Sequence, residues 1–269
     1  MSLAEELRQR ARATWAAGDY DRVAPLVTPV GARVIDQIGV AAGQDVLDVG
    51  TGTGGNVAIP AALRGARVVG LDVTPELLEG ARERADDAGV DVEWVEGDAQ
   101  HLPFDDARFD RVISTFGAMF APDHRRAAAE LVRVCRPGGL VAMTTWSNSG
   151  FAGEIFKLTG RYLPPPPDGV QSPPAWGADA HVEETFGAAG ATPKIEHMTV
   201  DFVFDSEQSA VEHYSEHFGP FVIARSVLEA QGRWDEFVGD FAGLVGEFNG
   251  AADGSARIRS GYLLVTVER

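Results

Sequence analysis

The sequence has a single cysteine, Cys135, and no run of the roughly eighteen apolar residues that a membrane-spanning helix needs. One cysteine excludes a disulfide within the chain and is typical of a reducing compartment. Because Cys135 lies among the apolar residues of a predicted helix, we interpret it as a buried structural thiol. The charged N-terminus lacks the apolar core of a signal peptide. We therefore expect a cytoplasmic protein that does not insert into a membrane.

Basic residues are scarce as well. The chain has two lysines, Lys157 and Lys194, and its 23 basic residues face 40 acidic ones, which gives a net charge of −17. Binding to nucleic acid depends on a basic patch, so we expect no nucleic acid partner. The heavy use of Ala, Gly, Arg and Asp with so little Lys favours a bacterial source.

The most informative stretch runs from Val46 to Gly54 and reads Val-Leu-Asp-Val-Gly-Thr-Gly-Thr-Gly. Its apolar residues and one acid predict a short buried strand, and its glycines predict a tight turn. A helix is expected from about Asn56. Such a turn presents backbone N–H groups beside a helix N-terminus, where a polar ligand can approach the main chain closely.

Two ligands compete for this turn. Gly50, Gly52 and Gly55 fit the dinucleotide pattern G-x-G-x-x-G, which predicts an NAD(P)-dependent oxidoreductase. Asp48 favours S-adenosylmethionine (SAM) instead, because a carboxylate two residues before the first glycine repels a pyrophosphate and attracts an ammonium or sulfonium. No tyrosine is followed four residues later by lysine, so the commonest base of short-chain dehydrogenases is missing. We prefer SAM and keep the oxidoreductase as the less favoured alternative.

Strands and helices alternate after this stretch, which predicts a parallel sheet with helices on both faces. Acids follow two of the strands at their carboxyl ends, where open α/β sheets bind ligands. Asp72 is placed to accept the hydroxyls of a ribose, and Asp98, with Ala99 beside it, to contact an adenine ring. The strands are expected at 45–49, 67–72, 92–96, 109–115 and 140–146. Of the helices expected between them, the one between 96 and 109 has the weakest sequence signal.

We expect one domain over residues 1–269. Residues 1–40 form a helical lid, with apolar positions Leu3, Leu7 and Ala11 on one face. Residues 41–150 form the cofactor-binding core. In the substrate-side half, 151–269, prolines 164–167 and 173–174 predict a stiff loop that lines the pocket. Strands at 194–204 and 257–267 predict an antiparallel hairpin at a sheet edge, interrupted by a helical insertion at about 206–249.

Four segments together resemble the class I SAM-dependent methyltransferases. They are Asp48–Gly54, Asp72, Gly97–Ala99 and Arg136-Pro137-Gly138-Gly139. The nearest group is the type 11, ubiquinone- and menaquinone-biosynthesis-like methyltransferases, of which the stretch from Leu102-Pro103-Phe104 to Phe109-Asp110 is typical.

This resemblance implies an α/β, Rossmann-like sheet of seven strands in the order 3-2-1-4-5-7-6, with strand seven antiparallel, N-terminal helices and a C-terminal helical insertion that forms a lid. It implies SAM as cofactor and S-adenosylhomocysteine (SAH) as product. The amino-acid end of SAM is expected at Asp48 and the glycine turn, the ribose at Asp72, the adenine at Asp98, and the methionine near Thr115, with Tyr20 closing over the cofactor. The expected cofactor-binding residues are Tyr20, Asp48, Gly50, Thr51, Gly52, Asp72, Val73, Asp98, Ala99 and Thr115.

No motif identifies the methyl acceptor or a catalytic residue. His213 and His217 stand in an H-x-x-E-H pattern, but no third ligand is evident, so we expect no metal. Aromatic residues of the insertion favour a small apolar or aromatic acceptor, methylated at O, N or C, although core packing explains them equally well. A SAM- or SAH-binding protein without catalysis remains an alternative, as do a monomer and a homodimer. The candidate bases are His101, His124, His181, His197, His213, His217, Tyr20 and Tyr214.

Overall fold

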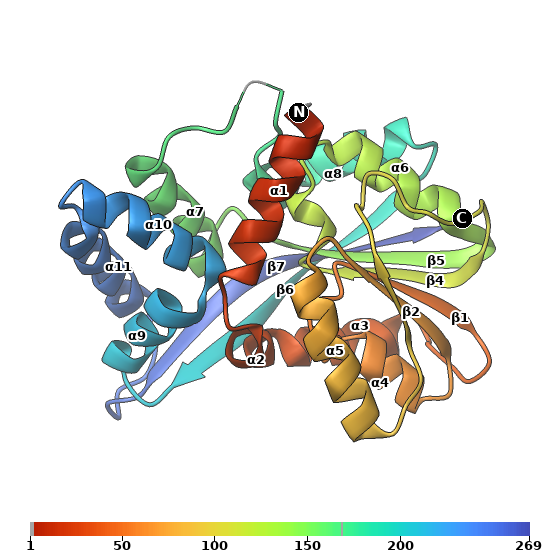
Figure 1. Cartoon of the computed structure of the whole chain (residues 1–269), viewed down its shortest axis with the longest axis horizontal. Helices are drawn as coiled ribbons and strands as arrows, with labels where there is room; N and C mark the ends of the chain where they lie inside the picture. Colours follow the sequence, from red (N-terminus) through yellow and green to blue (C-terminus); the bar gives the residue numbers. More distant parts are fainter. Residues whose placement is uncertain (1–2, 168) are drawn as a thin grey trace.

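The structure is a computed structural model that describes residues 3–167 and 169–269, so residues 1 and 2 of the expected N-terminal lid lie outside it. Figure 1 shows the elements in chain order. The helices are α1 Leu3–Ala16, α2 Tyr20–Val23, α3 Thr28–Gln37, α4 Ala58–Leu63, α5 Pro75–Ala88, α6 His124–Val134, α7 Phe151–Tyr162, α8 Asp179–Ala188, α9 Glu207–His217, α10 Gly219–Ala230 and α11 Trp234–Phe248, with short 3-10 turns η1 Ala24–Val27, η2 Ala118–Phe120 and η3 Pro173–Gly177. The strands are β1 Asp45–Val49, β2 Arg67–Asp72, β3 Glu93–Glu96, β4 Phe109–Thr115, β5 Cys135–Trp146, β6 Pro193–Phe204 and β7 Ala256–Glu268.

The sheet has seven strands in the order β3-β2-β1-β4-β5-β7-β6. The pairs from β3 to β5 are parallel, whereas β7 runs antiparallel to both β5 and β6. The predicted Rossmann-like order and the antiparallel seventh strand are therefore confirmed. The order reverses beside β1, so the carboxyl ends of β1 and β4 lie next to each other where a crevice is expected.

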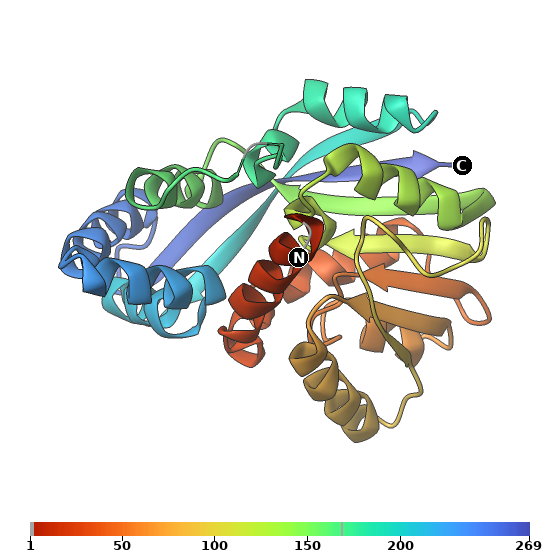
Figure 2. The ribbon, with the colours of Figure 1, turned by 45° about the horizontal axis from the view of Figure 1, so that its top comes forward.

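Alternate residues of β1 face two separate cores. Val46 packs in a cluster with residues of α3 and α4, while Leu47 and Val49 pack in a second cluster with residues of α6 and α8. Because both faces are covered, the strand is buried almost throughout. Figure 2 shows α6 and α8 on the opposite side of the sheet from α3 and α4.

The predicted insertion is a group of three helices, α9 to α11, beside the long outer end of β6 and β7 (Figure 1). Phe221, Phe237 and Phe241 fill its interior, and all three are fully buried. Pro220 stands at the start of α10, where its lack of an N–H costs nothing. The chain therefore breaks into separate helices at the proline without losing the shared core.

Three local expectations are wrong. The helix after the glycine turn begins at Ala58 instead of about Asn56. No helix forms between β3 and β4, where every residue is described. The strand expected at 140–146 begins earlier, at Cys135, and Arg136–Gly139 forms a bulge within it, between the pairs Phe109 with Cys135 and Arg111 with Leu140. Gly138, at φ +75°, allows this bulge.

Among the helices that the structure describes, none is long and apolar enough to cross a membrane. Cys135 is fully buried in the second core cluster, as the sequence predicts, and burial raises the pKa of its thiol to about 11.

Candidate functional site

The glycine turn after β1 is held by its own backbone. Gly50 and Gly52 have φ of +71° and +57°, a region that suits glycine. The N–H groups of Gly50 and Thr51 both donate to the carbonyl of Leu71, at 2.8 and 3.0 Å, and Gly54 N–H donates to Thr51 O at 2.9 Å. A Cβ on Gly50 would lie 2.7 Å from Gly117 Cα, so this glycine also permits close approach of the loop after β4.

Asp72, the last residue of β2, completes the turn. Its Oδ2 accepts the backbone N–H of Gly52 at 2.8 Å, and its Oδ1 accepts that of Thr74 at 2.9 Å. Burial raises the pKa of this carboxyl, and the two N–H donors lower it in part. Each carboxylate oxygen retains capacity for a further hydrogen bond.

Asp48, in β1, forms hydrogen bonds that stabilise the glycine turn. Its Oδ2 accepts from the Thr51 hydroxyl at 2.6 Å and from the N–H of Ala58, the first residue of α4, at 3.2 Å. Burial raises the pKa of Asp48 to about 7, the Thr51 and Ala58 donors lower it, and Asp72 raises it further. The carboxyl group thus fastens the turn to the helix that follows.

These bonds limit the N–H groups that the turn can offer to a ligand. Those of Gly50, Thr51, Gly52 and Gly54 are all used within the protein, and the N-terminal N–H of α4 is taken by Asp48. A pyrophosphate needs such donors free. These N–H groups are therefore not available to a phosphate.

A cavity of about 520 Å³ lies over the carboxyl ends of β1, β2 and β4. Nine of the ten predicted cofactor residues line it, and Asp48 does not. The direct contact between Asp48 and a cofactor stays a prediction, and the observed bonds give this acid a role in shaping the turn. The lining residues among the predicted ten are Tyr20, Gly50, Thr51, Gly52, Asp72, Val73, Asp98, Ala99 and Thr115.

Asp98 stands at the end of the cavity beside β3. Its Oδ1 accepts the backbone N–H of Gln100 at 2.9 Å and the Gln100 side-chain amide at 3.1 Å. This short turn fixes the carboxylate in place, next to Ala99 in the cavity wall. Asp72 and Asp98 therefore present two fixed acceptors to the same space.

Three buried hydroxyl groups in the lining lack a hydrogen-bond partner among the described residues. They belong to Tyr20, Thr53 and Thr115. Burial and the neighbouring charge of Asp72 raise the pKa of Tyr20. The nearby N–H of Gly219 lowers this pKa, although its geometry with the Tyr20 hydroxyl is not that of a hydrogen bond. Because an unpaired buried hydroxyl is costly, these three groups indicate a polar ligand in the cavity.

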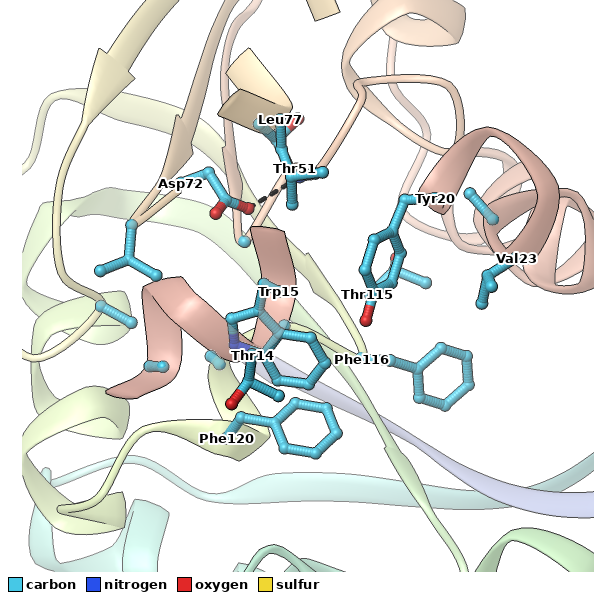
Figure 3. Close-up of a pocket in the computed structure, with 18 of the residues that line it drawn as sticks. Thr14, Trp15, Tyr20, Val23, Thr51, Asp72, Leu77, Thr115, Phe116 and Phe120 are labelled. Carbon is cyan, nitrogen blue, oxygen red and sulfur yellow. Dashed lines mark hydrogen bonds between the residues drawn. The ribbon is translucent and has the colours of Figure 1, made fainter. Parts of the chain in front are cut away.

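The rest of the wall is largely apolar and aromatic. Phe116 stacks on Trp146 with ring centroids 3.7 Å apart, and Trp15 meets Phe120 at 4.7 Å. Figure 3 shows Trp15, Tyr20 and Phe120 pointing toward the same space from three different segments. One end of the cavity is thus polar and the other suits an apolar molecule.

Several lining residues lie outside the ten that the sequence predicts to bind the cofactor. The apolar face predicted for the first helix faces the cavity through Leu7, Ala11 and Trp15. Gly117 and Phe116, directly after the predicted strand end at Thr115, also line it. Phe116 has φ +55°, a strained value for a bulky residue. Prolines 164–167 and 173–174 lie outside the lining, so the predicted proline wall of the pocket is wrong.

The candidate bases fall into those that line the cavity and those that do not. Within the described residues, Tyr20 and Tyr214 line the cavity and none of the six histidines does. His124 Nδ1 lies 2.9 Å from His181 Nε2, and the rings of His213 and His217 are 5.3 Å apart. Residues 3–167 and 169–269 contain no group of three or more His, Cys, Asp or Glu side chains that could hold a metal.

Comparison with known proteins agrees with this geometry. A family model described as a methyltransferase domain matches residues 47–143, which span the glycine turn, Asp72 and most of β5. An uncharacterised protein of Mycobacterium tuberculosis is 39% identical over 215 residues, which cover 79% of this chain and 78% of that protein. A demethylmenaquinone methyltransferase of Deinococcus radiodurans is 38% identical over 124 residues, 45% of this chain and 51% of the relative.

Among solved structures, a putative methyltransferase from Bacillus halodurans superposes with a TM-score of 0.61 at 21% identity, over 88% of this chain and 97% of that one. At this identity the likeness concerns the fold. Together with the matched domain and the relatives, it establishes that the chain belongs to the class I SAM-dependent methyltransferases, in the type 11 family.

Proposed function

We propose that the protein transfers the methyl group of SAM to a small, apolar or aromatic molecule, at an oxygen, nitrogen or carbon atom. The observation that carries this proposal is one cavity with two unlike ends. The fixed carboxylates of Asp72 and Asp98 lie at one end, and an aromatic wall with Phe116 and Trp146 forms the other. A polar nucleoside and an apolar acceptor would fit such a cavity side by side.

The polar end fits SAM in three respects. Asp72 has acceptor capacity left for ribose hydroxyls, and Asp98 for the adenine amino group. The unpartnered hydroxyls of Tyr20 and Thr115 would gain partners from the cofactor. The acidic end also suits a ligand that carries an ammonium and a sulfonium.

Gly52 adds room at this end. A Cβ placed on it would meet nothing within 4 Å, so the turn borders open space there. We assign the amino-acid end of SAM to Gly50, Thr51 and Gly52, and the ribose to Asp72 with Val73. Asp98 and Ala99 would hold the adenine, and Tyr20 and Thr115 the remaining polar atoms.

SAM supplies an activated methyl group when bound, so the protein has mainly to position the acceptor and exclude water. The apolar wall provides the exclusion. Tyr20, on the short helix α2, lies over the polar end and supports a role for the N-terminal helices as a lid. The helices α9 and α10 contribute Tyr214 and Pro220 to the other end, and Phe218 between them lines it too, which supports the same role for the insertion.

The relative named demethylmenaquinone methyltransferase is in line with a ring-containing, apolar acceptor. The chain spans about half the length of that relative, so the acceptor class is drawn mainly from the cavity wall. Placement in the cytoplasm and the choice between monomer and homodimer stay predictions.

One assay tests the proposal. The purified protein is incubated with SAM and a panel of phenols, thiols, amines and quinols, and SAH release is measured. SAH release that depends on an apolar acceptor is the expected result. SAM binding without SAH release across the panel would instead favour a SAM-binding protein without catalysis.

A further inference from the structure

Tyr214 on α9 is a buried phenol without a hydrogen-bonding partner. Its side chain lines the cavity and the residue is 6% exposed. Its ring lies against the rings of Phe151, Phe218 and Phe241, with centroids 5.4 to 5.9 Å apart. No described residue forms a hydrogen bond with its hydroxyl group, whereas Tyr162 on α7 donates its hydroxyl to Asp240 at 3.0 Å.

The part of the wall that follows β5 in the chain has few other polar groups. Thr159 is satisfied, because its hydroxyl donates to the Ile155 carbonyl at 2.7 Å. The indole N–H of Trp146 belongs to a partly exposed residue that water can reach. Tyr214 is therefore the buried residue in this part of the wall whose polar group has no partner among the described residues. The lining residues from β5 onward are Trp146, Ala152, Ile155, Phe156, Thr159, Phe202, Tyr214, Phe218 and Pro220.

Charge is missing from this end as well. The charged residues of the lining are Arg8, Asp72 and Asp98, which come from α1, from the end of β2 and from the loop after β3. Burial alone raises the pKa of Tyr214, with no charged group acting on it. A charged group of an acceptor placed here would be desolvated without a counter-charge, which is costly.

We propose that the Tyr214 hydroxyl binds a neutral oxygen or nitrogen of the methyl acceptor, and that the acceptor is uncharged at this end. This inference rests on the proposed function and narrows its acceptor class. A hydroxyl, carbonyl or neutral amine on an apolar frame would pair with Tyr214. Carboxylates and phosphates would be rejected, because their charge would be desolvated here without a counter-charge. A molecule without a polar atom would leave the Tyr214 hydroxyl unpaired, and a site with such a group discriminates against partners that cannot satisfy it.

Packing in the core accounts for the ring of Tyr214 but not for its oxygen. Phenylalanine would fill the same aromatic cluster, so packing of the ring gives no reason for the hydroxyl. The substitution Tyr214→Phe therefore leaves the cluster intact and removes the proposed contact. Tyr162→Phe is a matched control, since Tyr162 is similarly buried, at 7% exposed, and lies outside the cavity lining.

The test uses three probes of one shape on the full chain, with and without SAH. The probes are 2-naphthol, 2-methylnaphthalene and 2-naphthoate, and their dissociation constants are measured by ligand-observed NMR titration. We expect the wild type to bind 2-naphthol about five- to tenfold more tightly than 2-methylnaphthalene, and 2-naphthoate more weakly than either. In Tyr214→Phe the dissociation constants of 2-naphthol and 2-methylnaphthalene should become about equal. The affinity for 2-methylnaphthalene should stay unchanged. In Tyr162→Phe the preference should persist.

The proposal is overturned if Tyr214→Phe keeps the preference for naphthol, if naphthoate binds as tightly as naphthol, or if the wild type binds no naphthol. Calorimetry with SAM separates this result from the proposed function. If the wild type fails to bind SAM but the naphthol preference still disappears in Tyr214→Phe, the methyltransferase proposal is contradicted. The proposed Tyr214 contact is then still supported.

Discussion

The Asp72 carboxylate accepts the backbone N–H of Gly52 at 2.8 Å. This bond joins the end of β2 to the glycine turn after β1, 20 residues earlier in the chain. It places an acid beside the turn before any ligand arrives, and it uses an N–H that a phosphate would otherwise take. The same contact therefore organises the cavity and restricts what can bind there.

Replacement of Asp72 should weaken SAM binding. We expect Asp72→Ala to raise the dissociation constant about tenfold or more, which corresponds to the roughly 1.4 kcal/mol of a lost charge-assisted hydrogen bond. Isothermal titration calorimetry measures the change. Asp36→Asn is the control, because Asp36 is exposed and paired with Arg64 on the surface. Equal SAM affinities for wild type and Asp72→Ala would remove the ribose assignment.

NADH should not bind. Gly50, Thr51, Gly52 and Gly54 have no N–H group left for a pyrophosphate, and Asp72 lies against the turn as an acid. A fluorescence titration of the protein with NADH should therefore show no saturation in the micromolar range. Saturable binding there would restore the oxidoreductase alternative.

Much of the site could be predicted because its chemistry follows the strand order. An acid at the end of a parallel strand faces the crevice whatever the details of packing, so Asp72, Asp98 and the glycine turn were located from their positions alone. The sheet order followed from the resemblance and is confirmed. These features depend on residues close together in the sequence or on a topology that few alternatives satisfy.

The remainder depends on contacts between distant segments. Trp15 meets Phe120 across 105 positions of the chain, counted as 120 − 15, and no periodicity within α1 shows whether its apolar face meets a core or a cavity. The sequence equally could not predict that all six histidines lie outside the cavity lining, because each stands in an ordinary helix, strand or loop pattern. The use of the turn N–H groups likewise depends on side chains and carbonyls brought in by β2.

Asp48 should make stability depend on pH. Burial raises its pKa to about 7, so between its ordinary value of 3.8 and 7 the folded state holds a proton that the unfolded state has lost. The stability that this neutral carboxyl provides is complete at low pH and is lost as the pH rises through about 7. Asp48→Asn keeps an acceptor for Thr51 and Ala58 and does not titrate.

We therefore expect the advantage of Asp48→Asn over wild type to grow by at least about 1 kcal/mol between pH 5 and pH 8, and to level off above that. Urea unfolding of both proteins across this range, without ligand, gives the difference directly. A difference that stays constant with pH would contradict the assignment of a buried, proton-holding Asp48.

The N-terminal lid and the helical insertion meet at two glycines. A Cβ on Gly219, the first residue of α10, would lie 2.2 Å from the Thr14 carbonyl oxygen, and one on Gly18 would lie 2.8 Å from Gly219 N. The Asp19 N–H also donates to the His217 carbonyl at 2.9 Å. These backbone contacts hold α1 and Tyr20 over the cavity.

Gly219→Ala should push α1 away from α10, because a backbone carbonyl cannot move aside as a flexible side chain can. We expect a loss of about 1 to 3 kcal/mol of stability and severalfold weaker SAM binding, since α1 and Tyr20 line the cavity. Gly239→Ala in α11 is the matched control: its Cβ would meet nothing within 4 Å, so the change should be neutral or stabilising through helix propensity. Thermal unfolding and calorimetry compare the two variants, and a Gly219→Ala protein that melts and binds SAM like Gly239→Ala would show that the lid does not depend on this contact.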